Sequence, residues 1–249
     1  MAELPKHAKV VVIGQGGIVG ASVVHHLIEE GWDDIVGLEK SAIPTDIGST
    51  SHASDFCYMT THDKLNVFTS TYSREFYKKR GNYIEIGGME VARKDDDERM
   101  LELIRKVGSG KAFGTNAHMI SAAEAKEKFP LLEESEIQGA LWDPDAGLVT
   151  PRSQKVAGDL VDEAVASGKL KAFAYTPATK ILVEDGVAVG VETPKGTIMA
   201  DYLVLCAGIW GSLVSNTADV KLPLLPLEHP LLFFGPWDHL EGTGKDIVY

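Results

Sequence analysis

The sequence predicts an α/β protein: a Rossmann-like domain, with a parallel sheet and a β-meander crossover, that carries an inserted α+β domain with a mixed sheet. Three observations predict this. An apolar run at 10–20 breaks into glycines and continues as a helix. A second apolar run, 35–39, ends in Glu39 about 20 residues after the glycines. Short β segments separated by turns then fill 172–207 and end in another apolar strand followed by glycines.

The first two observations define one βαβ unit. The helix is expected over 18–30, with Val23, Val24, Leu27 and Ile28 on one face. Gly31 supplies its end, because a glycine tolerates the left-handed conformation that closes a helix. The run 35–39 is then expected to return as a strand parallel to the first.

The glycines have the chemistry of a dinucleotide site. A pyrophosphate must approach the unpaired N–H groups of a helix start, and a Cβ at the turn would hold it away. The spacing Gly14-Gln15-Gly16-Gly17-Ile18-Val19-Gly20 carries one residue more than the usual G-x-G-x-x-G. Either the turn is one residue longer, or Gly17 and Gly20 take the later roles. An ordinary βα turn is the alternative, but Glu39, placed to accept hydrogen bonds from a ribose, favours a dinucleotide.

Composition narrows the classes of partner. The chain has 249 residues, 44% of them hydrophobic, and a formal net charge of −12, so it can form one or two soluble domains. The negative charge disfavours nucleic acid and anionic membranes as partners. No apolar run approaches the roughly 20 residues of a membrane span, and no leader pattern is found. We therefore expect a cytoplasmic protein without membrane insertion. Cys57 and Cys206 are interpreted as inert thiols, and no metal site is expected.

The inserted region alternates helices and strands. The segment 48–56 is rich in small hydroxylated residues, which suits a ligand's phosphates and equally suits a plain turn. A helix over 63–80 would bury a stripe formed by Leu65, Phe68, Tyr72 and Phe76. A strand is expected over 83–93. The acidic run 95–97 begins the next helix, whose apolar residues include Leu101, Leu103 and Ile104.

Later signals complete the order of elements. Ser121 and Glu124 form a capping box, and a strand is expected over 139–142. Thr150 as N-cap and Pro151 at the first helical position open a helix. Strands follow at 172–175, 179–183, 187–192, 197–199 and 202–207, with hairpin turns at 185–186 and 195–196, and 222–234 is expected to form a further strand.

The order of these pieces resembles the D-amino-acid oxidase and glycine oxidase superfamily of flavoproteins, most closely its sarcosine and dimethylglycine dehydrogenase branch. The resemblance covers nearly the whole chain, and GSTSHA is its most specific motif. The segments that carry it are VVIGQGGIVG (11–20), LEK (38–40), GSTSHA (48–53), PLL (130–132), DPDAGLVTPRS (143–153), GVAVGVETPKGTIMADYLVLCAGIWG (186–211) and LPLLPLEHP (222–230).

The resemblance implies an FAD site and two domains. Residues 1–65 and 150–215 would form the FAD-binding domain, and 66–149 with 216–249 an incomplete substrate domain. In that branch the histidine of the GST-x-HA motif is bonded covalently to FAD, and His52 matches it; neutral imidazole is a nucleophile. Without the motif, His52 would be interpreted as a surface or capping residue. The residues expected to contact the cofactor are Gly14, Gly16, Gly17, Ile18, Val19, Gly20, Glu39, Lys40, Ser49, Thr50, Ser51, His52, Phe56, Ala178 and Gly208.

The resemblance also implies the reaction. A small N-methylated amino acid such as sarcosine or dimethylglycine would lose hydride to the flavin, and the resulting iminium would hydrolyse to the demethylated amine and formaldehyde. An electron-transfer flavoprotein or oxygen would reoxidise the flavin. His229 falls where the family has a histidine that binds or deprotonates the substrate amine. The alternative for His229 is a core histidine bonded to a neighbouring carbonyl.

Two other functions stay open at this stage. One is a non-covalent flavin- or NAD-dependent oxidoreductase acting on a hydroxy acid; Glu39 would repel the 2′-phosphate of NADP. The other is a catalytically silent nucleotide-binding fragment. Members of the family continue beyond this length, so we expect a truncated product or a fragment whose flavin site is open on one side.

Overall fold

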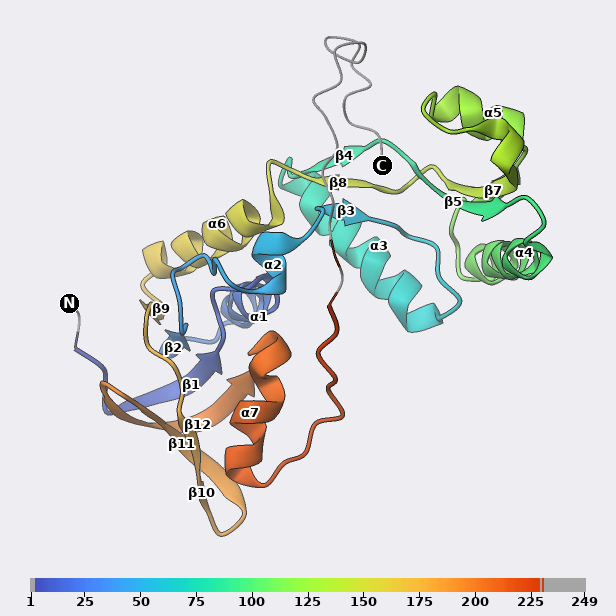
Figure 1. Ribbon diagram of the computed structural model, residues 1–249. Helices are drawn as coiled ribbons and strands as arrows, with labels where there is room; N and C mark the ends of the chain where they lie inside the picture. The colour runs from blue at the N-terminus through green and yellow to red at the C-terminus, as the bar shows by residue number, and fades with distance from the viewer. Residues whose placement is uncertain (1–2, 229, 231–249) are drawn as a thin grey trace. The chain divides into compact units, whose positions relative to one another are not determined.

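The computed structural model describes residues 3–228 and Pro230. The chain divides into two compact units (Figure 1). Unit 1 combines residues 1–54 with 151–230, and the described residues of unit 2 are 55–150. The division therefore falls at 54/55 and 150/151, and residues 216–228 lie with unit 1. Which unit binds cofactor and which binds substrate stays a prediction.

Unit 1 is built on one six-stranded sheet. Its strands are β1 (His7–Ile13), β2 (Ile35–Leu38), β9 (Leu170–Phe173), β10 (Lys180–Glu184), β11 (Val187–Thr193) and β12 (Gly196–Leu205). Their order is β10-β11-β12-β1-β2-β9. Strand β1 is parallel to both neighbours, with Val10 beside Ile35 on one side and Tyr202 on the other. Strands β10, β11 and β12 form the antiparallel meander that the sequence predicts.

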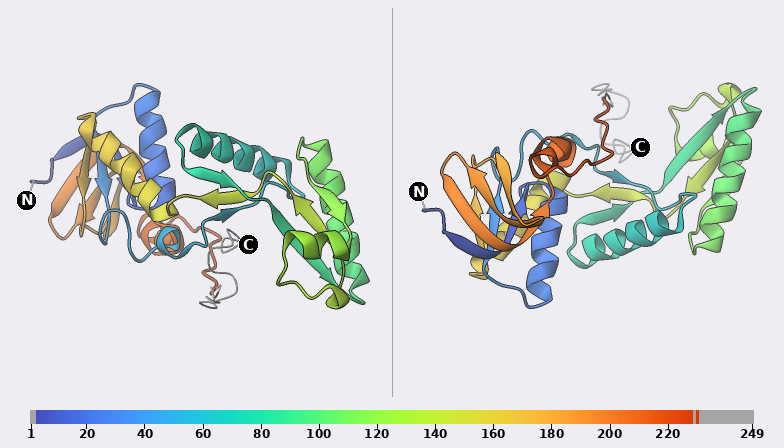
Figure 2. Two further views of the ribbon diagram at one scale, coloured as in Figure 1. Left: turned by 90° about the horizontal axis from the view of Figure 1, so that it is seen from above. Right: turned by 90° about the horizontal axis from the view of Figure 1, so that it is seen from below.

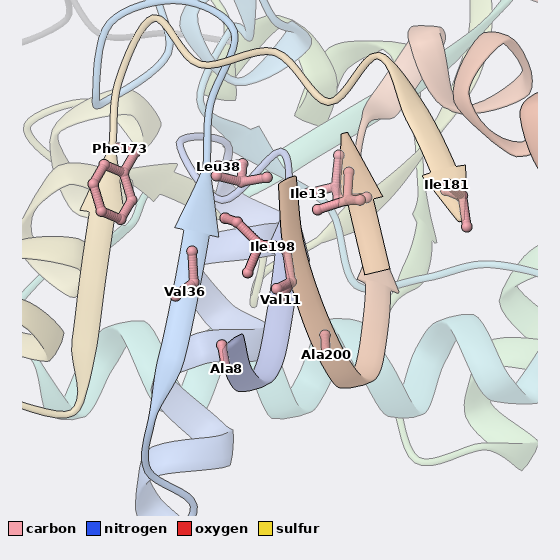
Figure 3. Close-up of a cluster of buried hydrophobic side chains, with 10 residues drawn as sticks. Ala8, Val11, Ile13, Val36, Leu38, Phe173, Ile181, Ile198 and Ala200 are labelled. Carbon is pink, nitrogen blue, oxygen red and sulfur yellow. The ribbon is translucent and has the colours of Figure 1, made fainter. Parts of the chain in front are cut away.

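The sheet is apolar on both faces. Along β1, Val11 and Ile13 alternate with Val10 and Val12, and all four are buried, as expected for a central parallel strand. Val11 and Ile13 join a core that draws on every strand of the sheet, shown in Figure 3: Ala8, Val36, Leu38, Phe173, Ile181, Val191, Ile198 and Ala200.

The helices of unit 1 are α1 (Ile18–Glu29), α2 (Ser49–His52), α6 (Ser153–Ala166) and α7 (Gly211–Ser215). Two 3-10 turns, η2 (Gly208–Trp210) and η3 (Asn216–Ala218), flank α7. Helices α1 and α6 pack side by side (Figure 2). Val24 of α1 and Leu160 of α6 are completely buried, so these two helices contribute to the interior of the unit.

Unit 2 contains two three-stranded antiparallel sheets among its described residues. One has the order β3 (Phe56–Cys57), β8 (Gly147–Val149), β4 (Tyr83–Glu85). The other has the order β5 (Gly88–Arg93), β7 (Ile137–Asp143), β6 (His118–Ile120). Its helices are α3 (Lys64–Lys79), α4 (Asp97–Ala112) and α5 (Ala122–Lys128), with the 3-10 turn η1 (Glu134–Glu136). Leu103, Val107 and Leu141 are buried between α4 and the second sheet.

Several sequence predictions are confirmed. The α/β class, the strands at 10–13 and 35–38, and the helix from Ile18 are as predicted. The capping box is present in full: the Ser121 hydroxyl accepts from the Glu124 N–H, and the Glu124 carboxylate accepts from the Ser121 N–H. The acidic run does open α4, with the Asp96 side chain as N-cap.

Others are wrong, for physical reasons. The single strand expected over 83–93 is two strands in different sheets, because Gly87 takes φ +74° between them. The strands expected at 197–199 and 202–207 are one strand, β12. Helix α6 starts at Ser153 rather than at Pro151, because the Thr150 backbone exchanges hydrogen bonds with Asn82 instead of capping the helix.

The loop at 48–56 contains the short helix α2, which its composition did not predict. Residues 222–228 form no strand, and the remainder of the strand expected over 222–234 lies outside the described residues apart from Pro230. The stripe expected to be buried on α3 is largely exposed: Leu65, Phe68 and Tyr72 all face solvent within the described structure, and Val67 is the buried residue. Hydrophobic periodicity locates a helix, but it does not show what covers the apolar face.

Candidate nucleotide site

Unit 1 contains a cleft of about 480 Å³ at the carboxyl ends of three adjacent strands. Residues directly after β1, β2 and β12 form its floor, which is where open α/β sheets bind ligands. The lining residues are Ile13, Gly14, Gly17, Ile18, Val19, Glu39, Lys40, Thr45, Gly48, Ser49, Thr50, Ala53, Ser153, Pro177, Ala178, Cys206, Ala207, Gly208, Ile209, Trp210 and Val214.

Two glycines are required by the fold itself. Gly14 has φ +87°, and a Cβ there would lie 2.5 Å from the Cys206 carbonyl oxygen. A Cβ at Gly20 would lie 2.5 Å from the Cα of Gln15, so Gly20 allows α1 to pack against the turn. Gly14 therefore makes the tight turn, and Gly20 makes the close helix contact. The extra residue of the motif lies between them.

Gly17 is different, because neither its backbone conformation nor its neighbours require a glycine at this position. Its φ is −87°, and an added Cβ would come no closer than 3.5 Å to a neighbour, the Thr50 hydroxyl. Gly17 is the N-cap of α1, supplies no side-chain cap, and lines the cleft. The space that a side chain would fill is thus left to the cleft, beside the positive end of the helix. Gly17 and Gly20 hold the two later positions of the motif.

Glu39 is buried and held in one orientation. Its Oε2 accepts from the Gly16 N–H at 3.1 Å, and its Oε1 accepts from the Ser41 N–H at 3.1 Å. A Cβ at Gly16 would lie 2.8 Å from Oε2, so the glycine lets the backbone reach the carboxylate. A carboxylate accepts about four hydrogen bonds, so this side chain keeps acceptor capacity at the cleft.

The GSTSHA segment forms one wall. The Thr50 hydroxyl accepts from the Ile18 N–H at 3.1 Å and ties α2 to the start of α1. Its neighbour Ser49 lines the cleft. His52 is exposed, and its Nδ1 lies 3.1 Å from the Gly48 carbonyl oxygen. A carbonyl can only accept, so this contact favours the tautomer with the proton on Nδ1 and the lone pair of neutral imidazole on Nε2. The Ser51 hydroxyl, 2.9 Å from Nδ1, donates to the same carbonyl.

Another part of the lining comes from the segment after β12 and from 177–178. The Lys40 ammonium lies 3.5 Å from the centre of the Trp210 indole ring. The Thr176 N–H donates to the Glu39 carbonyl at 2.7 Å, and Lys195 from the meander donates to the Thr176 hydroxyl at 2.7 Å. The wall beside Ala178 is thereby anchored to both β2 and the hairpin.

The structure gathers most of the predicted cofactor residues at this cleft: Gly14, Gly17, Ile18, Val19, Glu39, Lys40, Ser49, Thr50, Ala178 and Gly208 line it. Gly16, Gly20, Ser51 and His52 do not line it themselves but adjoin residues that do: Gly16 contacts Glu39, and Ser51 and His52 follow Thr50 in α2. Phe56 belongs to unit 2, where it packs against Gly88. His229, the predicted catalytic residue, lies outside the described residues.

Sequence reasoning missed several lining residues, among them Thr45, Ser153, Pro177, Ile209 and Trp210. Most come from loops that carry no spacing rule. Trp210 had one available signal, because it stands just after the strand and glycine at 203–208. The glycine turn likewise follows the end of a strand, β1. Residues after β12 could therefore have been assigned to the same edge of the sheet.

Unit 2 has a smaller cavity of about 430 Å³ between β3 and α3, with Cys57, Arg74, Tyr77 and Tyr83 in its wall. Burial raises the pKa of the Cys57 thiol, and the charge of Asp55 raises it further, so the thiol is a weak nucleophile. Burial also raises the pKa of Tyr83, whose hydroxyl donates to the Asp145 carbonyl at 3.0 Å. Arg74 is already paired with Glu85 and Asp145.

Two features are absent from the described residues. No cluster of three or more His, Cys, Asp or Glu side chains within them is arranged to hold a metal ion. None of their helices is long and apolar enough to cross a membrane.

A Rossmann-like sheet with such a cleft defines a dinucleotide-binding class of protein. Comparison with known families agrees: the chain belongs to the FAD dependent oxidoreductase family (DAO), whose family model matches residues 9–247.

Curated relatives share about 30% of their residues with the chain. It is 32% identical to human mitochondrial sarcosine dehydrogenase over 91% of the length of this chain. It is 32% identical to the mouse mitochondrial pyruvate dehydrogenase phosphatase regulatory subunit over 94%. It is 30% identical to 4-methylaminobutanoate oxidase (formaldehyde-forming) of Paenarthrobacter nicotinovorans over 91%. The chain spans only 25% to 27% of the length of these relatives.

Among solved structures, L-proline dehydrogenase from P. horikoshii is similar, with a TM-score of 0.78 and 29% identity. The match covers 88% of this chain and 57% of that one. Glycine oxidase from Bacillus cereus has the same fold, with a TM-score of 0.68 and 24% identity.

Proposed function

We propose that unit 1 binds FAD in its cleft and that the chain supplies the FAD-binding part of an oxidoreductase for small N-methylated amino acids. The observation that carries the proposal is the pairing of a helix N-terminus left open by Gly17 with a fixed carboxylate, Glu39, at the adjacent strand end. A pyrophosphate fits the first feature, and a ribose hydroxyl fits the second.

The chain's own residues divide the work of binding. The start of α1 offers backbone N–H donors and a partial positive charge of about 0.5, which stabilises a diphosphate. Glu39 accepts a hydrogen bond from a ribose hydroxyl. The apolar side chains of Ala178, Ile209 and Trp210 would shield the apolar surface of the bound FAD from water. When bound, FAD supplies the redox chemistry by accepting hydride from the C–H bond next to the substrate nitrogen.

The names of the relatives support an N-methylated substrate. Sarcosine dehydrogenase, dimethylglycine dehydrogenase and 4-methylaminobutanoate oxidase (formaldehyde-forming) each match about 90% of the chain. We propose oxidative N-demethylation as the reaction and His229 as the group that takes a proton from the substrate amine. The electron acceptor, oxygen or an electron-transfer flavoprotein, and the cytoplasmic location stay predictions.

We also propose that His52 holds the flavin covalently through Nε2. The carbonyl of Gly48 favours the tautomer with the proton on Nδ1, so the nucleophilic lone pair is on Nε2. His52 stands three residues after Ser49, which lines the cleft, and so shares its face of the short helix.

The test begins with the absorption spectrum of the purified chain. Visible flavin bands support the FAD site, whereas an NAD-dependent enzyme lacks them. After denaturation and gel filtration, a covalent flavin elutes with the polypeptide, and mass spectrometry places it on the peptide that contains 48–53. Colour that separates from the polypeptide overturns the His52 assignment. His52→Ala should bind FAD reversibly, with Lys155→Ala, at an exposed position on α6 that does not line the cleft, as a surface control.

Activity is measured separately, by dye reduction with sarcosine, dimethylglycine and 4-methylaminobutanoate. Formaldehyde formed in a one-to-one ratio with reduced dye identifies oxidative N-demethylation. Reduction by L-proline without formaldehyde would contradict the N-methylated substrate class and leave the FAD site standing.

A second candidate function rests on one comparison. The mouse pyruvate dehydrogenase phosphatase regulatory subunit matches 94% of the chain, and its name is that of a regulatory protein. A catalytically silent nucleotide-binding chain would bind FAD or ADP and reduce no dye with any amine. Formaldehyde production from sarcosine or dimethylglycine excludes it.

A further inference from the structure

Lys40 and Trp210 form a bridge across the cleft. The Lys40 ammonium lies 3.5 Å from the centre of the Trp210 indole, within the range of a cation–π interaction. Both residues line the cleft, and both belong to unit 1. Lys40 is exposed, so its side chain can move without disturbing the core.

The topology shows what the bridge crosses. Lys40 follows the end of β2, Trp210 follows the end of β12, and β1 lies between these two strands. The glycine turn begins at the end of β1, with Gly14. The bridge therefore joins the two strands that flank the turn, on the carboxyl edge that a dinucleotide must cross to reach the start of α1.

Charge shows which ligand group competes for the ammonium. Among the described residues that line the cleft, Lys40 is the single Lys or Arg, in a chain with a net charge of −12. A charge-assisted hydrogen bond to a phosphate oxygen is stronger than a cation–π contact at an exposed site. A diphosphate at the helix start thus offers Lys40 a better partner than the indole.

We propose that Lys40 is a positioning residue with two partners: it bridges to Trp210 in the ligand-free cleft and transfers to the diphosphate when a dinucleotide binds. This inference rests on the proposed FAD site and adds the step by which the site opens. Transfer to the phosphate uncovers the Trp210 ring, so the environment of one identifiable tryptophan should report binding.

The experiment uses ADP, which carries the adenosine and diphosphate of FAD, and adenosine, which lacks the phosphates. The full chain carries His52→Ala so that any flavin can be removed first. Tryptophan emission is followed during titration. ADP should change the emission, and adenosine should change it far less. The ADP signal should be lost in Trp210→Leu and kept in Trp32→Leu.

Affinity is then compared among Lys40 variants by calorimetry. Lys40→Met should weaken ADP binding about tenfold, as expected for one lost charge-assisted hydrogen bond, and leave adenosine binding within about twofold. Lys40→Arg should restore most of the ADP affinity. Lys9→Met is the matched control. Lys9 lies in β1 of the same unit, its ammonium is 4.8 Å from the centre of the Trp32 ring, and it does not line the cleft.

The outcomes separate this inference from the proposed function. If neither ADP nor FAD binds the parent chain, the FAD site itself is wrong. If ADP binds and Lys40→Met binds it as tightly as Lys9→Met does, the site stands and the two-partner role of Lys40 is overturned. Equal losses for ADP and adenosine also overturn it, because they would show a general distortion of the cleft.

Discussion

The two units are stabilised in different ways. In unit 1, both faces of the central strands are buried, and α1 and α6 each contribute side chains with no exposed surface, such as Val24 and Leu160. In unit 2, helix α3 exposes 67% of Leu65 and 66% of Phe68. Apolar periodicity is present in both units, but on α3 of unit 2 it does not coincide with burial within the described residues.

Unit 2 relies more visibly on ion pairs. Arg74 contacts Glu85, Glu75 and Asp145, and Lys78 also contacts Glu85. A second network joins Arg99 to Glu90 and Glu102, with Lys106 on Glu90. These pairs are partly exposed, so each adds little to stability and fixes mainly the geometry of the unit. Packing thus stabilises both units, and in unit 2 partly exposed ion pairs also fix the arrangement of the elements.

The largest expected effect is at Gly20. Gly20→Ala places a Cβ 2.5 Å from the Cα of Gln15, which the backbone cannot avoid without moving α1. We expect a loss of about 3 kcal/mol in the free energy of unfolding of unit 1 by urea titration. Gly17→Ala, which meets no close neighbour, should keep stability within about 1 kcal/mol and weaken FAD binding. Equal destabilisation by both changes would refute the different roles assigned to them.

The next effect compares one leucine from each unit. Leu160→Ala removes a completely buried side chain and should lower the free energy of unfolding by about 3 kcal/mol. Leu65→Ala should change it by less than about 0.5 kcal/mol, because the side chain is mostly exposed. A large loss at Leu65 would show that its face on α3 is covered in solution.

A smaller effect is expected at Asp143 in unit 2. Its buried carboxylate accepts from the Met59 and Thr60 N–H groups at 3.0 and 2.8 Å. Asp143→Ala leaves both donors buried without this acceptor, so a loss of about 2 kcal/mol is expected by urea titration. Asp143→Asn keeps one acceptor oxygen and should lose less; a larger loss for Asn than for Ala would contradict this account.

The smallest effect is the pH dependence at Glu85. Hydrogen bonds from Arg74, and then from Lys78, hold the Glu85 pKa below its ordinary value of 4.5. Its stabilising contribution is therefore present above pH 4.5 and is lost as the pH falls through the lower pKa of the folded state. Because the pair is partly exposed and screened by solvent, the contribution is below about 1 kcal/mol. Glu85→Gln should narrow the stability difference between pH 7 and pH 3; an unchanged difference would exclude Glu85 as a source.

The structure of unit 1 could be predicted from the sequence more completely than that of unit 2. The strands of unit 1 and helix α1 follow from apolar runs bounded by glycines, because local pattern and final burial agree there. The exposure of α3 could not be predicted, since periodicity carries no information about what lies opposite a helix. The cap of α6 failed because Asn82, far away in sequence, engages the Thr150 backbone.

The candidate site shows the same division. Gly14, Gly17 and Glu39 could be assigned from spacing, because a βαβ unit places the ends of its strands at one edge. Spacing could not separate the glycine that frees space for a ligand from those that relieve close contacts of the backbone. Trp210 reaches the cleft because β12 pairs in parallel with β1. The strand and glycine at 203–208 mark the end of a strand, but they do not say which strand lies beside it.

The position of β1 also has a consequence for synthesis of the chain. Val10 pairs with Tyr202 on one side, so a strand made at the start acquires that neighbour only after most of the chain has left the ribosome. At typical translation rates the delay is on the order of ten to forty seconds. Throughout that interval the β1 backbone has one unpaired edge, which leaves the nascent chain open to pairing with strands of other chains.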